Sequence, residues 1–150
     1  MIVEPELARR RFEADIKPLL DDGAPYEAFG VRLVEYEWPA LVVALRWGTR
    51  EIRLRIDATD YDTQPVSGRW VDHNGGPLLA GQKLVPSGNG FHHQGPQPGT
   101  PGRLCFAGWR EYYELHSQDA WSAIRGQAQY KPLALIQHIA SLLGRGVEAA

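Results

Sequence analysis

The sequence predicts an α+β fold, in which helices pack against one antiparallel sheet. Three observations predict it. An amphipathic segment opens the chain, alternating apolar runs joined by short turns follow, and two further helical segments come last. The chain has 150 residues, of which 43% are hydrophobic, and this suffices for one domain with a real core. We therefore expect a single domain over residues 1–150.

The first expected element is a helix over residues 5–20. Pro5 suits the first helical turn, and Ala8, Phe12 and Ile16 recur on one face. The Asp-Asp-Gly-Ala-Pro segment at 21–25 is expected to end this helix, because aspartate, glycine and proline all favour turns.

Four strand-like runs follow the helix. In the third run, Ile52, Leu54 and Ile56 occupy alternate positions, which places them on one buried face. The intervening Arg53 and Arg55 then face solvent. Because short turns join the runs, the sheet is predicted to be an antiparallel meander. The expected strands cover residues 30–36, 40–47, 51–57 and 65–71.

The remaining elements are a long loop and two helices. About half of residues 84–102 are Gly or Pro, so no regular structure is expected there, and a loop of this length in a small domain is typically functional. Helices are predicted over 118–125 and 131–143 from their apolar spacing.

Composition excludes several classes of protein. The single cysteine, Cys105, rules out a disulfide within the chain and favours a reducing compartment, so a cytoplasmic location is expected. The net charge of −2 offers no basic footprint for nucleic acid or a membrane surface, so neither partner is expected.

Cys105 is the candidate nucleophile. A nucleophilic thiol needs access, a way to become a thiolate, and donors for the oxyanion that forms during attack. Cys105 comes directly after the Gly/Pro-rich loop, and that loop carries His92, His93 and Gln94. These three polar side chains are the local candidates for the supporting roles.

Five segments, in the same order along the chain, resemble the ubiquitin-conjugating enzyme family. GRLCF (102–106) is similar to its active-site segment, and FHHQ (91–94) stands where the family has His-Pro-Asn. The others are LRIDATDYDTQPV (54–66), DAWSA (119–123) and LALIQHIASLL (133–143). The resemblance implies the fold of that family, with a long active-site loop and a shortened C-terminal helical part. It is closest in kind to bacterial members that occur beside ubiquitin-like genes in antiphage defence operons.

The resemblance also implies an activity and its partners. Cys105 would accept a ubiquitin-like protein from an activating enzyme as a thioester and transfer it to an acceptor protein, without a cofactor. Gln94 would support the oxyanion in place of the family's Asn, beside His92 and His93. The basic cluster Arg9, Arg10 and Arg11 on the first helix would be the docking surface for the activating enzyme.

Two alternatives remain open from the residues. Thiolate, carboxylate and imidazole form a good zinc set, which Cys105, Glu114, His116 and His138 could supply. Against this, the apolar neighbours of His138 on its helix favour a hydrogen-bonded core histidine. The other alternative is an inactive scaffold with a packed Cys105. In such a scaffold the Trp and Tyr residues would serve as interface anchors, although Trp109, Tyr112 and Tyr113 are more typical of core packing than of a binding patch.

Overall fold

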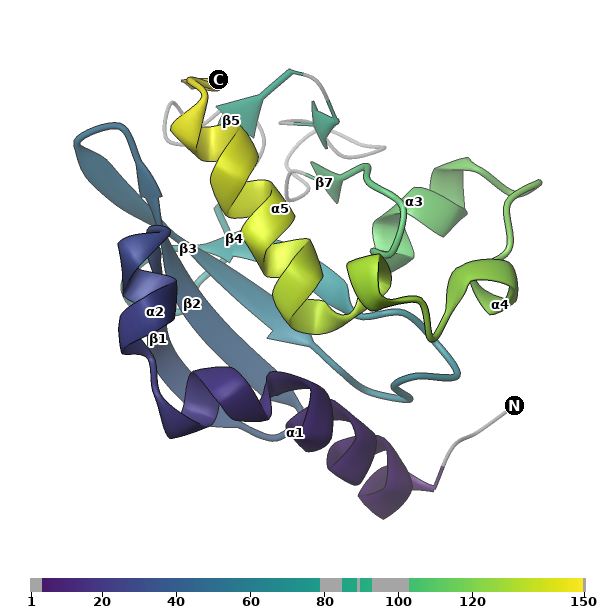
Figure 1. The fold of residues 1–150 in the computed structure, drawn as a ribbon. Helices are drawn as coiled ribbons and strands as arrows, with labels where there is room; N and C mark the ends of the chain where they lie inside the picture. Colours follow the sequence, from purple (N-terminus) through teal and green to yellow (C-terminus); the bar gives the residue numbers. More distant parts are fainter. Residues whose placement is uncertain (1–3, 79–84, 89, 93–102, 150) are drawn as a thin grey trace.

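A four-stranded antiparallel sheet with helices on one face forms the centre of the protein (Figure 1). The structure is a computed structural model, and it describes residues 4–78, 85–88, 90–92 and 103–149. The strands follow the chain in the order β1-β2-β3-β4. They are β1 (Val31–Glu37), β2 (Ala40–Trp47), β3 (Arg50–Asp57) and β4 (Ser67–Val71). The predicted α+β class and antiparallel meander are thereby confirmed.

Alternation along β3 and β4 separates a buried face of the sheet from a solvated one. Leu54 and Ile56 are fully buried, and Leu54 pairs across the sheet with the buried Trp70. The intervening Arg55 pairs with Arg69, and both side chains are exposed. Because side chains alternate between faces along a strand, these two arginines share the face opposite the core.

Two long helices cover the buried face. Helix α1 (Pro5–Asp21) begins where the Glu4 side chain accepts hydrogen bonds from the first free amides, and α5 (Pro132–Gly144) lies diagonally across the sheet (Figure 1). Phe12 of α1 is fully buried, and its ring meets the Tyr61 ring edge-on at 5.7 Å. Both helices agree with the predicted ranges to within one residue. Within the described residues, no helix is long and apolar enough to cross a membrane.

The structure corrects the predicted connections. The segment expected only to end α1 leads at once into a second short helix, α2 (Ala24–Ala28). The Gly/Pro-rich segment is not wholly irregular, because it contains two short strands. They are β5 (Pro86–Ser87), which pairs with β8 (Glu148–Ala149), and β6 (Phe91–His92), which pairs with β7 (Arg103–Leu104). Gly88 and Gly90 both have positive φ, a backbone conformation that glycine adopts without strain, and this lets the chain reverse there. Residues 93–102 of the predicted loop lie outside the described part of the chain.

The segment between Cys105 and α5 also differs from the prediction. It contains α3 (Arg110–Leu115), where no helix was expected, and α4 (Trp121–Ile124), which is shorter than the predicted 118–125. A short 3-10 turn (Ala128–Tyr130) leads into α5. Helix α3 packs beside β4 and β7, which brings its C-terminal end close to Cys105.

Candidate functional site

Cys105 lies directly after β7, at the end of a small hairpin. Its backbone N–H donates to the carbonyl of Gly90 over 2.8 Å, and the side chain is half-buried. The preceding Leu104 is 1% exposed and pairs with the buried Phe91. The backbone around Cys105 is therefore anchored on one side by the core, while part of its side chain reaches the surface.

Close packing at Gly90 holds this hairpin in place. Gly90 has a φ of +96°, and a Cβ atom there would lie 2.6 Å from the Phe106 ring. The Phe106 ring in turn meets Phe91 edge-on at 5.1 Å. Only glycine satisfies both the backbone conformation and the space, so the position of the residue after Cys105 depends on Gly90.

His116 is the side chain that the fold brings to Cys105. It follows the last residue of α3, and its Nδ1 lies 3.9 Å from the Cys105 Sγ, within reach of a sulfur hydrogen bond. The two residues are eleven positions apart in the chain. Helix α3 folds back between them and closes this distance. The Cys–His pair is the chemical centre of the candidate site.

The second contact of His116 involves the same ring nitrogen that lies near the sulfur. Nδ1 also lies 3.0 Å from the backbone carbonyl of Tyr112. A carbonyl oxygen only accepts, so this hydrogen bond requires the proton on Nδ1. That single proton serves the carbonyl at 3.0 Å and reaches the more distant Sγ at 3.9 Å only as the weaker arm of a shared hydrogen bond. A protonated Nδ1 beside the sulfur stabilises a thiolate at Cys105 through this shared hydrogen bond and does not act as its base through the same nitrogen.

Tyr112 and Asp119 support the His116 ring from the outer side. The Tyr112 and His116 rings stack with centroids 4.1 Å apart and an interplanar angle of 9°. The Tyr112 hydroxyl donates to the Asp119 carboxylate, and this hydrogen bond raises the pKa of Tyr112 to about 12. The phenol consequently stays neutral at physiological pH and keeps its donor role.

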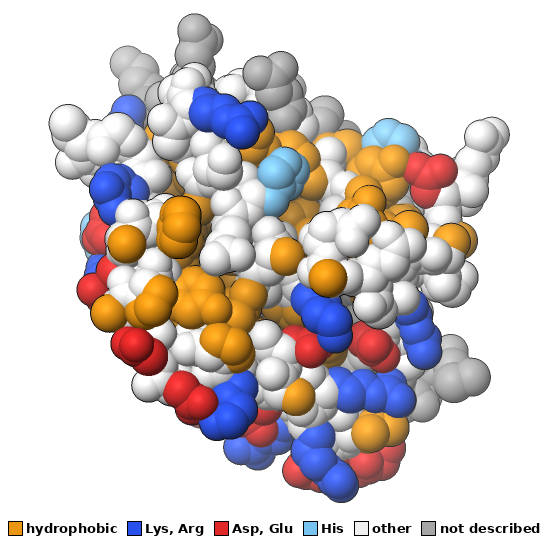
Figure 2. All heavy atoms as spheres, in the orientation of Figure 1, with side chains coloured by type: hydrophobic (Ala, Val, Ile, Leu, Met, Phe, Trp, Pro, Cys, Tyr) orange, Lys and Arg blue, Asp and Glu red, His pale blue; other side chains and the backbone are white. Residues whose placement is uncertain are grey.

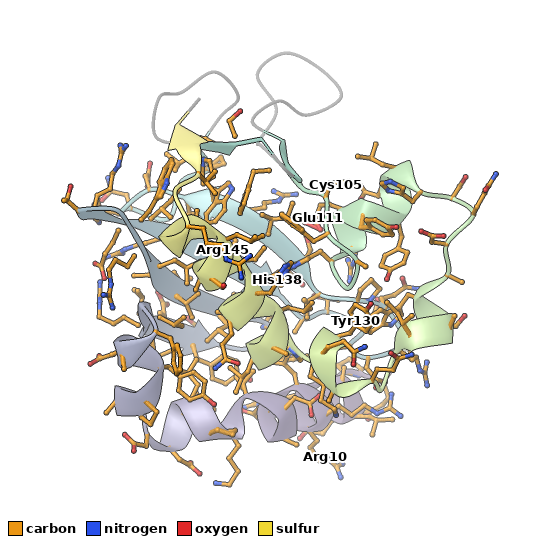
Figure 3. The ribbon with its side chains drawn as sticks, turned by 45° about the horizontal axis from the view of Figure 1, so that its top comes forward. Arg10, Cys105, Glu111, Tyr130, His138 and Arg145 are labelled. Atoms are coloured by element: carbon orange, nitrogen blue, oxygen red, sulfur yellow. The ribbon has the colours of Figure 1, made fainter. Side chains whose placement is uncertain are left out.

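A buried carboxyl group fastens α3 to the sheet. Glu111 is 8% exposed, and its Oε1 accepts hydrogen bonds of 2.7 Å from both the Ser67 hydroxyl and the Gly68 amide of β4. Trp109, immediately before the helix, is fully buried against Gly68, where a Cβ atom would lie 2.8 Å from the indole ring. These contacts place α3, and with it His116, relative to β4 (Figure 3 shows Glu111 and Cys105 on this side of the molecule).

Burial raises the pKa of Glu111 above its ordinary value of 4.5. The charge of Glu114 adds to this shift, whereas the hydrogen bonds from Ser67 and Gly68 oppose it. Because the folded-state pKa is higher than the unfolded-state pKa, the folded protein binds more protons between the two values. The contribution of Glu111 to the free energy of unfolding is thus greatest below pH 4.5 and declines as pH rises through the raised pKa.

Replacing Glu111 with glutamine is expected to weaken this pH dependence. Glu111→Gln keeps an oxygen for Ser67 and Gly68 but removes the titration, which is worth about 1.4 kcal/mol for each unit of pKa shift. Denaturant unfolding between pH 5 and 8 measures the slope, with Glu37→Gln, an exposed carboxyl on β1, as the matched control. Equal slopes for Glu111→Gln and the unmodified protein would contradict the assignment.

The other predicted catalytic residues lie in or beside the undescribed segment. His93 and Gln94 are outside the described residues. The backbone of His92 pairs with Arg103, and its side chain is outside the description. The proposed oxyanion role of Gln94 and the supporting roles of His92 and His93 therefore stay predictions.

The structure does not group the four residues of the predicted zinc set. In the part of the chain that the structure describes, which includes all four, no three His, Cys, Asp or Glu side chains are placed to share a metal ion. Cys105 and His116 are close, whereas His138 is on α5, where its ring meets Phe106 edge-on at 5.5 Å. His138 is exposed, so the expected hydrogen-bonded core position was wrong. Glu114 is exposed on α3.

The basic cluster predicted for docking is paired with acids. Arg9 contacts Glu13 at 3.1 Å and Arg11 contacts Asp62 at 3.1 Å, while Arg10 lies 3.8 Å from a carboxylate one helical turn earlier. Figure 2 accordingly shows basic and acidic side chains side by side over α1. Arg10 lies at the opposite end of the molecule from Cys105 (Figure 3). A surface here would thus offer alternating charges instead of a positive patch.

Sequence reasoning considered His116 only as a metal ligand and did not connect Tyr112, Asp119 or Glu111 with Cys105. A signal for the pairing of Tyr112 with His116 was present, since these two residues are four positions apart and share a helix face if the segment is helical. Glu111 had no comparable signal, because its partners are more than forty residues away.

No family model matches the chain, and no curated protein matches it significantly. What the site does must therefore be argued from Cys105, His116 and their surroundings.

Proposed function

We propose that the protein is a ubiquitin-conjugating-like enzyme, which carries a ubiquitin-like protein as a thioester on Cys105. The observation that supports it is the half-buried thiol with an imidazole nitrogen 3.9 Å from its sulfur, at the end of a hairpin anchored in the core. This arrangement suits acyl transfer through sulfur, because a protonated imidazole nitrogen beside the sulfur stabilises both the attacking thiolate and the thiolate that leaves in the second step.

The proposed reaction has two steps of the same kind. In the first, the Cys105 thiolate attacks the carbonyl carbon of a thioester on the activating enzyme. The tetrahedral intermediate collapses, the activating enzyme's sulfur leaves as a thiolate, and a new thioester remains on Cys105. In the second, a nucleophile of the acceptor protein attacks that carbonyl and loses its proton to solvent or a base, and the Cys105 thiolate leaves. His116 is a positioning residue here, since it touches the sulfur and not the acyl group.

Zinc binding is the second candidate, because Cys105 and His116 would supply a thiolate and an imidazole to one ion. Two ligands are fewer than the three or four protein ligands of typical zinc sites, and Glu114 and His138 are not grouped with them. The acyl-transfer proposal needs no further ligand from the described residues, so the observed pair favours it.

A peptide thioester tests the chemistry without any partner protein. Incubation with the protein is expected to add the acyl mass to Cys105, as measured by intact mass spectrometry, and dithiothreitol should remove the added mass. Cys105→Ala should give no adduct, and Cys105→Ser should give at most a reductant-stable ester. The same reaction with a chelator present separates the two candidates, because a zinc-bound thiolate would react faster once the metal is removed. The absence of an adduct both with and without chelator would contradict the proposal.

A further inference from the structure

The solvated face of the sheet carries an unusual like-charge pair. Arg55 of β3 and Arg69 of β4 stand directly opposite each other in the antiparallel register, and both are exposed. Like charges in directly opposite positions destabilise a sheet. Among the described residues, no carboxylate forms a salt bridge with either arginine, whereas Arg32 of β1 pairs with Glu51 of β3 at 2.9 Å. Within the described chain, the repulsion at this position is therefore not offset by a salt bridge.

The pair borders a concave site with a third arginine. A cavity of about 360 Å³ is lined by Arg55, Asp57, Thr59, Ser67, Arg69 and Arg110. This volume falls at the lower end of the range for small-molecule sites. The single acid, Asp57, has one oxygen engaged with the Thr59 amide at 2.9 Å. Three guanidinium groups against one carboxylate leave the cavity with an excess of positive charge.

Arg110 is held in place at the cavity wall. Its Nη2 donates to the carbonyls of Thr59 at 2.9 Å and Pro65 at 3.1 Å, and its Nε donates to Pro65 at 3.3 Å. Those bonds use one side of the guanidinium group. Its Nη1 has no partner among the described residues, so a donor on a fixed cation remains for a ligand. Such preorganised guanidinium groups match the oxygens of phosphate.

We infer that this cavity binds the dianionic phosphate group of a small molecule, held by Arg55, Arg69 and Arg110. The ligand would neutralise the repulsion between the paired arginines and would accept from the open donor of Arg110. The Thr59 hydroxyl adds a neutral donor, whereas the Ser67 hydroxyl already donates to Glu111 over 2.7 Å. This site is separate from Cys105 and does not depend on the proposed acyl transfer.

Phosphate-dependent thermal stabilisation tests the site. At constant ionic strength set with chloride, inorganic phosphate is expected to raise the melting temperature of the unmodified protein, since a ligand that binds only the folded state stabilises it. Arg55→Gln and Arg69→Gln should weaken phosphate binding by about tenfold, the loss of one charge-assisted contact. Arg125→Gln removes an exposed arginine of the α4 region and should respond like the unmodified protein.

The stability of the two arginine variants with and without phosphate distinguishes a specific site from general charge screening. Without phosphate, Arg55→Gln and Arg69→Gln should be at least as stable as the unmodified protein, because each removes the repulsion. Phosphoserine and inorganic phosphate in parallel arms then show whether an esterified or a free phosphate binds better. An unmodified protein that does not respond to phosphate, or equal responses from it and both variants, would overturn the inference.

Discussion

Replacing Trp109 with alanine is expected to lower the free energy of unfolding by about 3–5 kcal/mol, the usual cost of removing a fully buried tryptophan. Trp109 is completely buried, and its indole ring fills the space above Gly68 that a side chain would otherwise occupy. The lost packing would leave a cavity between α3 and β4. Urea unfolding followed by circular dichroism measures the difference.

Two further variants test whether the loss of stability in Trp109→Ala comes from its packing against Gly68. Leu115→Ala alters an exposed side chain on the same helix and should change the free energy of unfolding by less than about 0.5 kcal/mol. Gly68→Val inserts atoms into the space beneath the indole ring and should destabilise by about 1–3 kcal/mol through overpacking. Equal stability of Trp109→Ala and Leu115→Ala would show that α3 is not fastened to the sheet through Trp109.

Replacing His116 with alanine is expected to slow alkylation of Cys105 by iodoacetamide at pH 7 by about threefold to tenfold. The variant loses the imidazole whose Nδ1 lies 3.9 Å from the sulfur, so a smaller fraction of the thiol is expected to be ionised. The effect is smaller than the change in that fraction, because a less stabilised thiolate is also more nucleophilic. The midpoint of the pH–rate profile should move to higher pH.

A histidine away from the site provides the control. His73 is exposed in the turn after β4, and His73→Ala should leave the pH–rate profile unchanged. Tyr112→Phe keeps the ring that stacks on His116 but removes the hydrogen bond to Asp119, so it should produce a smaller slowing than His116→Ala. A His116→Ala profile that coincides with the unmodified one would contradict a role for His116 in stabilising the thiolate.

The four-stranded sheet and the first helix could be predicted because local hydrophobic patterns encode them. Ile52, Leu54 and Ile56 alternate with arginines, and this period-two pattern requires one buried and one solvated face. The resulting strand β3 begins at Arg50, one residue before the predicted start. The helix over 5–20 was equally clear, since its apolar spacing matches one face of a helix.

The surroundings of Cys105 could not be predicted in the same way. Helix α3 has six residues and no apolar period, and it is held by contacts of Glu111 and Trp109 with a strand far back in the chain. The pairing of β5 with β8 likewise joins segments about sixty residues apart. His138 was expected in the core from its helix neighbours, but whether a helix position is covered depends on the elements that pack on it.

The most direct test of the central claim is formation of a thioester on Cys105 with protein partners. The protein is incubated with a ubiquitin-like protein and the activating enzyme that charges it, with and without ATP, and the products are separated without reductant. The proposal predicts an ATP-dependent adduct that dithiothreitol cleaves and that Cys105→Ala lacks. An adduct that forms equally on Cys105→Ala, or no adduct when the activating enzyme itself is charged, would contradict it.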